Sequence, residues 1–387
     1  MMKKKNVLVM VMMGLAILFC GTSCSEDENT DGPDNGSVLT EEEIDAAIAT
    51  YVDDIVIPTY KDMLDKVTIF KTKVDAFVAS GSQEDLNIAC QAWRTAREPW
   101  EYSEAHLGGP ADVLNLDPSM DSWPLDKEGI NGIIKSGDFS KLEGYEDKSM
   151  ELRGFHTAEY MLFFDGQPRD LTKSQDELDL SNTNLKKYLQ IVVEDIFKDT
   201  ETLYNAWAKG LEGNDDYPTS YGEALKKHDS TYGKTSAEVV LSVILAEEGG
   251  MAAIANEVGE IKIGDPITNY KEDPEKGLLS VESWYSWNSI TDYSNNIKGV
   301  RNCYLGSLDG KTVNASSLSA LVKKVDASLD TKVQEKINAA IAAIENIPAP
   351  FRNHLDVTKY PQVTAAQDAC AEVVDVLKEV RTKLGAN

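Results

Sequence analysis

The chain has 387 residues, with 38 Lys and Arg against 65 Asp and Glu and a formal net charge of −27 at pH 7. Such acidity excludes a nucleic-acid partner, because phosphate contacts need a basic face, and it favours cations or basic ligands. Its five cysteines are scattered, which excludes a disulfide-rich scaffold. Cys90, Cys303 and Cys370 allow one bridge at most, and the simpler interpretation is three small buried residues.

Residues 1–23 have the composition of an export signal. Lysines near the start precede an apolar run from Val7 to Phe19, which is shorter than the roughly 20 residues that span a bilayer. Small residues at 21–23 predict cleavage before Cys24 and attachment of a lipid to that cysteine. Gly21 departs from the leucine usual at its position, so ordinary secretion stays an alternative.

Residues 24–37 are acidic and nearly free of apolar groups, which predicts a disordered tether. The Ser-Glu-Asp-Glu run after Cys24 resembles the acidic export tag of surface lipoproteins in Bacteroidetes. We therefore expect an outer-membrane lipoprotein that is exposed at the cell surface and touches the membrane through its N-terminal lipid only. Attachment on the periplasmic face is the alternative.

Helical periodicity dominates the remaining chain, and no alternating β pattern of useful length occurs, so the predicted class is all-α. Between residues 44 and 77 apolar side chains recur at steps of three and four, with Pro58 expected to kink or break the helix. Further helices are predicted over 83–107, 149–164, 184–211, 234–260, 275–305, 315–327, 330–346 and 361–384.

Two loop-rich regions, 108–148 and 165–183, are longer than the usual connections in helical bundles. A boundary in the second one predicts two antiparallel bundles, residues 38–170 and residues 181–387. Each has about the size of a four-helix bundle with appendages.

His156 and Glu159 lie three residues apart in the apolar stretch RGFHTAEYMLFF. On a helix these positions share a face, so the two side chains can bind one metal ion or one hydrogen-bonding ligand together. Apolar residues 162–164 place the helix in the core, where a carboxylate needs a partner. A buried histidine bonded to its own helix-mate is the alternative.

The segment QAWRTAREPWEYSEAHLGGP is a second candidate. Arg97 and Glu101 stand at i and i+4, which is typical of a salt-bridged amphipathic helix. Arg97 and Glu104 lie two turns apart and can instead line one side of a polar pocket.

A third candidate is residues 281–306, a run rich in Ser, Asn, Asp and aromatic residues. Polar residues on an interior helix must be satisfied by each other or by a ligand, whereas an exposed helix face would need no partner. The chain has no HExxH or HxxEH pair, and two ligands make a poor catalytic zinc site.

Together these segments resemble the imelysin family, iron-regulated lipoproteins and periplasmic proteins once classed as metallopeptidases. The motifs that carry the resemblance are GxHxxE at 154–159, WxxARxPxxxSE beginning at Trp93, GGP at 108–110, SWPLD at 122–126 and NxYLG at 302–306. The resemblance implies two similar four-helix bundles with a site at their interface, and a role in iron uptake with doubtful peptidase activity. Trp100 and Trp287 depart from the family pattern, and the second replaces a frequent Asp.

We therefore expect a lipid-anchored protein that binds iron, another divalent or trivalent metal, or an iron chelate between two bundles. The expected metal ligands are His156, Glu159, Glu104 and Asp292. The expected supporting residues are Arg97, which would grip a carboxylate or an anionic chelator, and Ser286, Asn288 and Trp123. The alternatives are a metallopeptidase with Glu159 or Glu104 as base, and a structural partner of an outer-membrane importer.

Overall fold

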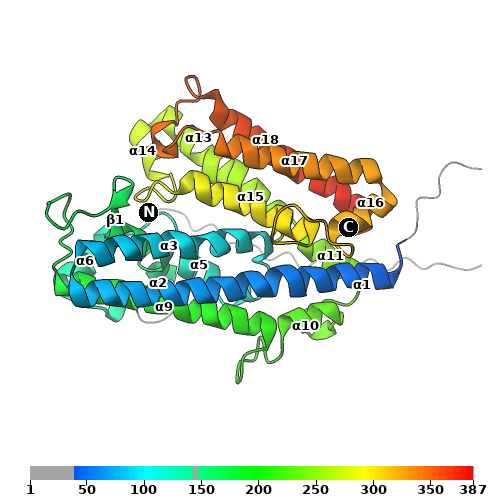
Figure 1. Ribbon diagram of the computed structural model, residues 1–387, viewed down its shortest axis with the longest axis horizontal. Helices are drawn as coiled ribbons and strands as arrows, with labels where there is room; N and C mark the ends of the chain where they lie inside the picture. Colours follow the sequence, from blue (N-terminus) through cyan, green and yellow to red (C-terminus); the bar gives the residue numbers. More distant parts are fainter. Residues whose placement is uncertain (1–38, 143–146, 387) are drawn as a thin grey trace, which may run out of the picture. The chain divides into compact units, whose positions relative to one another are not determined.

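The structure is a computed structural model that describes residues 39–142 and 147–386, and nearly all of its regular elements are helices (Figure 1). This confirms the all-α class. The predicted signal peptide, Cys24 and the acidic tether lie outside the described residues. Among the helices of the described part, none has the length and apolar character needed to cross a membrane.

The elements follow one another in three stretches of the chain. The first contains α1 (Glu41–Thr50), η1 (Tyr51–Val56), α2 (Ile57–Ser80), α3 (Gln83–Ser103) and η2 (Glu104–His106). The second contains α4 (Pro110–Val113), α5 (Leu116–Asp121), α6 (Lys127–Ser136), η3 (Ser140–Leu142), α7 (Asp147–Met150), α8 (Gly154–Leu162), β1 (Phe163–Phe164), β2 (Gln167–Pro168) and α9 (Thr183–Ala208). The third contains α10 (Tyr221–Lys226), η4 (Ser230–Tyr232), α11 (Ala237–Ile244), α12 (Met251–Asn256), η5 (Glu257–Ile263), α13 (Gly264–Glu272), α14 (Pro274–Leu279), α15 (Ser289–Leu305), α16 (Leu318–Val325), α17 (Ala327–Glu345), η6 (Phe351–Asn353) and α18 (Pro361–Lys383).

Helices α2, α3, α8 and α9 form one group of four packed helices. Helix α2 buries a stripe of apolar residues at three- and four-residue steps, as an amphipathic helix does. That stripe consists of Met63, Val67, Phe70, Val74 and Phe77. Gly81, in the left-handed region at φ 62°, ends α2, and the Ser82 side chain accepts a hydrogen bond from the Asp85 N–H to begin α3.

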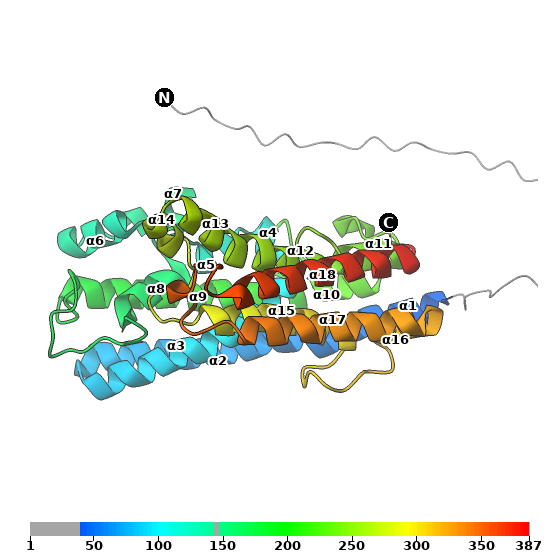
Figure 2. The same ribbon diagram turned by 90° about the horizontal axis from the view of Figure 1, so that it is seen from above.

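A second group of four consists of α15, α17, α18 and the continuous helix α12–η5. Figure 2 shows α17 and α18 running side by side. Helix α15 also packs against α3 and so joins the two groups. Gly299 permits this contact, since a β-carbon there would overlap the backbone carbonyl of Tyr102.

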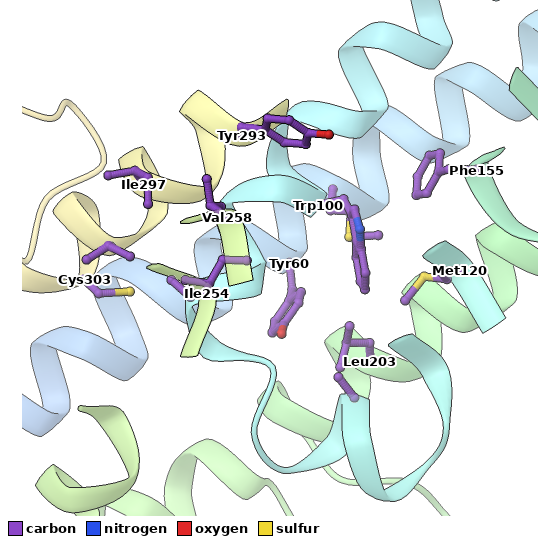
Figure 3. Packing of buried hydrophobic residues seen from close by; sticks show 14 of the residues in the cluster. Tyr60, Trp100, Met120, Phe155, Leu203, Ile254, Val258, Tyr293, Ile297 and Cys303 are labelled. Atoms are coloured by element: carbon purple, nitrogen blue, oxygen red, sulfur yellow. The ribbon is translucent and has the colours of Figure 1, made fainter. Parts of the chain in front are cut away.

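The hydrophobic core continues from one group to the other. Figure 3 shows Tyr60 of α2 and Trp100 of α3 in the same region as Val258 of η5 and Ile297 of α15. Each of these side chains has 0% exposure. The charged cluster described below borders this apolar core, since the Trp100 ring N–H donates a hydrogen bond to Asp121.

Some helix predictions need correction. Residues 234–260 do not form one helix, because Gly249 is in the left-handed region at φ 68° and α12 begins only at Met251. Residues 275–305 are interrupted between Leu279 and Ser289, where Ser283 and Trp287 have φ of 52° and 61°. A left-handed residue cannot continue a right-handed helix.

Other expectations differ in detail. Pro58 does not break the helix, because the widened π-helical turn η1 precedes it and α2 starts with proline in its first turn. The region 108–148 contains short helices instead of plain loop.

Helix α9 begins inside the predicted C-terminal bundle but packs against α2 and α8. The boundary predicted near 165–183 therefore does not separate α9 from the N-terminal helices.

We expect a pH dependence of stability from His106, which is 2% exposed and contacts Tyr60 with ring centroids 5.0 Å apart. Burial lowers the pKa of His106 to about 3. Below about pH 6.5 His106 is therefore protonated in the unfolded chain but stays neutral in the folded chain. The free energy of unfolding falls as the pH drops. Between pH 7 and 4.5 the parent should lose about 2 kcal/mol more than His106→Gln, measured by urea unfolding. Equal losses would contradict this explanation.

Candidate metal centre

A cluster of charged side chains lies where α3, α5 and α8 meet η5 and α15. Its members are Arg97 and Glu101 of α3, Glu104 of η2, Asp121 of α5, His156 and Glu159 of α8, Lys262 of η5, Glu282, and Asp292 of α15. Each of their side chains is 8% exposed or less. Charges buried to this degree must be paired with one another or bind an ion.

His156 stands at the centre of this cluster. Its Nδ1 lies 2.9 Å from Glu159 Oε2, and its Nε2 lies 3.2 Å from both Asp121 Oδ1 and Glu282 Oε1. Burial lowers the pKa of His156, but the three carboxylates outweigh burial and raise it to about 10. The imidazole is therefore a cation here, and it donates from both nitrogens.

Glu159 orients the imidazole from behind. One carboxylate oxygen accepts from His156 Nδ1, and the other accepts from the backbone N–H of Ser286 at 2.7 Å. The edge of Trp123 contacts the His156 ring with centroids 5.1 Å apart. These contacts direct Nε2 toward Asp121 and Glu282, as outer carboxylates do for metal-binding histidines.

Arg97 pairs with the acids on the α3 side of the cluster. Its guanidinium contacts Asp121 and Glu101 closely and lies 3.6 Å from Asp292 and 3.8 Å from Glu282. Burial raises the pKa of Glu101 to about 8, even though Arg97 opposes that shift. The cluster thus holds more carboxylates than its cations can neutralise.

Asp292 is held by neutral donors. Ser283 donates a hydroxyl hydrogen bond to it at 2.5 Å, and Asn288 donates its side-chain amide at 2.6 Å. Arg94 in turn donates to the Asn288 oxygen and to the Ser286 carbonyl, both at 2.7 Å. This network fixes residues 280–288, the irregular segment that carries Glu282.

Lys262 pairs with two further acids of the cluster. Its Nζ lies 3.2 Å from Glu104 and 3.1 Å from Glu282. Burial raises the pKa of Glu104 well above its ordinary value, despite the attraction of Lys262. Burial also acts to raise the pKa of Glu282, but Lys262 and His156 reverse this and lower it far below its usual range.

Four members of the cluster form the floor of a cleft of about 920 Å³. Among the residues that line the cleft are Glu104, Asp121, Lys262 and Glu282 from the cluster, together with Asp117, Trp123, Glu257, Ile261, Leu279 and Tyr285. Burial raises the pKa of Asp117 to about 7, with a further contribution from Asp121. The cleft is thus acidic at its floor, and Ile261 and Leu279 add exposed apolar surface.

Gly154 positions Asp121 against His156. Its φ is 81°, and a β-carbon there would overlap the Met120 carbonyl, one residue before Asp121. The glycine of the GxHxxE motif is thus required both by its left-handed backbone and by the close passage of α5.

We expect Gly154→Ala to lower the free energy of unfolding by about 2 kcal/mol or more, since it adds strain and overlap. Gly132→Ala is the matched control, because nothing lies within 4 Å of the added carbon in helix α6. The control should stabilise the protein by about 0.5–1 kcal/mol. Thermal or urea unfolding measures both, and similar effects of the two changes would contradict the role assigned to Gly154.

The structure brings the sequence-predicted site residues of the described chain together in and around this cluster. They are Arg97, Glu104, Trp123, His156, Glu159, Ser286, Asn288 and Asp292. Glu159 and Asp292 were predicted to be metal ligands, but in the structure their oxygens accept hydrogen bonds from protein donors. Ser286 contributes its backbone N–H and carbonyl to the network.

Sequence reasoning missed Asp121, Glu282 and Lys262. Asp121 stands directly before the SWPLD motif and Glu282 at the start of the Ser- and Asn-rich run, so their positions carried a signal. Nothing in the sequence around Lys262 pointed to a site.

Among the described residues, two groups of three side chains could hold a metal ion, and within each group the ligand atoms lie within 4.8 Å of one another. The first is Asp121, His156 and Glu282, and the second is Glu101, Glu104 and Asp121. One imidazole with two carboxylates is a ligand set that suits iron and other first-row divalent metals. The residues present therefore fit a metal ion at the first group.

The chain is similar to several known proteins. The family model for imelysin matches residues 56–380. Iron-regulated protein A of Synechococcus elongatus is 29% identical over 334 residues, covering 86% of this chain and 84% of that protein. A crystal structure from Parabacteroides distasonis, of a protein named as an iron-regulated protein A precursor, is 47% identical, with a TM-score of 0.86 over 91% of this chain and 97% of that one.

A crystal structure of an imelysin-like protein from Psychrobacter arcticum has a TM-score of 0.65 at 12% identity, and it covers 90% of this chain and 97% of that one. At this identity the likeness shows the fold alone. The family match over residues 56–380 extends across most of the sequence, from the end of η1 to the last turn of α18. The chain therefore belongs to the imelysin family.

Proposed function

We propose that this protein binds iron as its cargo through Asp121, His156 and Glu282, and serves in iron uptake as a lipid-anchored protein of the outer membrane. The observation that carries the proposal is the convergence of three ligand atoms from α5, α8 and the segment before α15. The lipid anchor and the cell-surface location rest on the sequence features at residues 1–37, and a transport partner in the outer membrane follows from the proposed role in iron uptake.

The geometry supports replacement of a proton by a metal. Glu282 accepts a hydrogen bond from His156 Nε2, and Asp121 Oδ1 lies 3.2 Å from the same nitrogen. Loss of that proton therefore leaves two carboxylate oxygens and a ring nitrogen close together. Glu159 keeps the proton on Nδ1 and so selects the tautomer that can ligate through Nε2. Burial of the three side chains strengthens their attraction for a cation.

The cleft supports an iron-bearing ligand as well as the free ion. A volume of about 920 Å³ is that of a small-molecule site and far exceeds the space of one ion. An organic chelator can lie against Trp123 and the apolar surface of the cleft while its metal reaches the floor. The names of the two iron-regulated relatives agree with a role connected to iron.

The contacts of Glu159 and Glu104 do not favour the metallopeptidase alternative. A general base needs a free carboxylate oxygen near the reacting water. Both oxygens of Glu159 accept hydrogen bonds, and Glu104 pairs with Lys262.

Titration of the purified protein with ferrous ion under anaerobic conditions tests the proposal. We expect one ion per chain, and Asp121→Asn should weaken binding by about tenfold to a hundredfold because it removes a charged ligand. Asp265→Asn is the matched control, since it makes the same change in the lining of the same cleft without belonging to either ligand group. Equal binding by the parent and Asp121→Asn would overturn the assignment.

A further inference from the structure

Lys262 is a charged group that the proposed metal site does not use, although it lies in the middle of the acids. Its side chain is 6% exposed, and its Nζ lies within 3.3 Å of both Glu104 and Glu282. A carboxylate that pairs with an ammonium has less negative charge available for a metal ion. The pairing therefore sets Lys262 against any cation that needs Glu282.

The two ligand groups show what the lysine blocks. Glu282 belongs to the group with His156, and Glu104 belongs to the neighbouring group that shares Asp121. Lys262 forms ion pairs with both Glu282 and Glu104. With its ammonium withdrawn, the carboxylates of both groups would face a cation at the floor of the cleft.

We propose, resting on the iron-binding function above, that the Lys262 ammonium occupies the metal position in the metal-free protein. Metal binding displaces this ammonium and makes Glu104 available as a further ligand. Lys262 is thus an affinity-determining residue. Its ammonium balances part of the negative charge of the metal-free acids.

Lys262 is suited to leave in a way that Arg97 is not. Arg97 is 0% exposed, and its two terminal nitrogens contact carboxylates of α3 and α5, so its departure would open the core. Lys262 lines the cleft, and its flexible four-carbon stem allows the ammonium to swing into that space.

The backbone around Lys262 is also unusual. Residues Glu257–Ile263 form the π-helical turn η5, between α12 and α13. A π-helical turn contains an extra residue relative to an α-helix, and such turns occur often at functional sites. Glu257 stands five residues before Lys262, in the same turn and on the lining of the same cleft. A displaced ammonium therefore has a carboxylate close to its new position.

Affinity for ferrous ion, measured anaerobically by calorimetry on the full-length protein, tests the inference. If the ammonium occupies the metal's place nine-tenths of the time, removing it should tighten binding by about tenfold. We expect this gain in Lys262→Met and in Lys262→Gln, the second of which keeps a polar group if methionine disturbs folding. Lys262→Arg keeps the charge and should bind no tighter than the parent.

Lys276→Met is the matched control, because Lys276 lines the same cleft but pairs with Glu272. It should change affinity by less than about threefold, since its charge is exposed and screened. In the Lys262→Met background, Glu104→Gln should then reduce the gained affinity, as expected of a new ligand.

The outcomes separate the inference from the proposed function. Iron binding by the parent with equal or weaker binding by Lys262→Met and Lys262→Gln would overturn the inference and leave the function standing. An equal gain in Lys276→Met would also overturn it, because net charge would then explain the effect. Failure of all folded variants and the parent to bind ferrous ion would overturn both.

Discussion

Replacing Arg97 by methionine should lower the free energy of unfolding by about 3–5 kcal/mol at pH 7.5, the largest stability effect expected in this protein. The guanidinium contacts Glu101 and Asp121 directly and lies 3.6 Å from Asp292, and both its side chain and that of Glu101 are 0% exposed. Methionine fills a similar volume but leaves Glu101 buried without its ion-pair partner and Asp121 with His156 alone. Urea unfolding followed by circular dichroism measures the loss.

The loss should shrink as the pH falls. Without Arg97 the pKa of Glu101, already raised by burial to about 8, rises further above its value in the unfolded chain. A carboxyl whose pKa is raised by folding takes up protons in the folded state, so acid relieves the repulsion and restores stability. At pH 5.5 the difference from the parent should therefore be smaller than at pH 7.5.

Arg94→Met is the matched control on the same helix. Arg94 donates to the Asn288 side chain and to the carbonyls of Ser286 and Gly166, which are neutral acceptors. Its removal should cost about 1–3 kcal/mol and lack the pH dependence. A pH-independent loss in Arg97→Met would contradict the assignment of Arg97 as the cation of this cluster.

Replacing His156 by glutamine should weaken ferrous-ion binding by at least about a hundredfold, the largest effect on binding that we expect. Glutamine removes the nitrogen ligand and also the group on which Asp121 and Glu282 converge, each 3.2 Å from Nε2. Calorimetry under anaerobic conditions measures the affinity, after circular dichroism has shown that the variant is folded.

Glu159→Gln distinguishes orientation from ligation. Substitution of a residue that only orients the histidine should weaken ferrous-ion binding by about tenfold to a hundredfold. Substitution of a direct ligand should weaken it as much as His156→Gln does. Because both Glu159 oxygens accept from protein donors, the smaller effect is expected. A loss equal to that of His156→Gln would restore Glu159 to the ligands.

Much of the fold follows from local patterns in the chain. The apolar stripe of α2 requires only that residues three and four apart share a helix face, and the Gly81–Ser82 turn ends one helix and begins the next. The left-handed residues Ser283 and Trp287 carry no such local mark, because neither is glycine or asparagine. Their conformation depends on the hydrogen bonds that residues 280–288 make to Arg94, Glu159 and Asp292.

Part of the candidate site also follows from local sequence, and part depends on the packing of distant helices. His156 and Glu159 were recognisable together because a helix places positions i and i+3 on one face. Their contacts with Asp121 and Glu282 depend on the close passage of α5 over Gly154 and on the hydrogen-bonded segment before α15. Ion pairs between side chains of separate helices leave no regular spacing in the sequence by which they could be predicted. The local chain thus specified the helices and the histidine, and only the packing of the two helix groups decided which carboxylates meet it and that Lys262 stands between them.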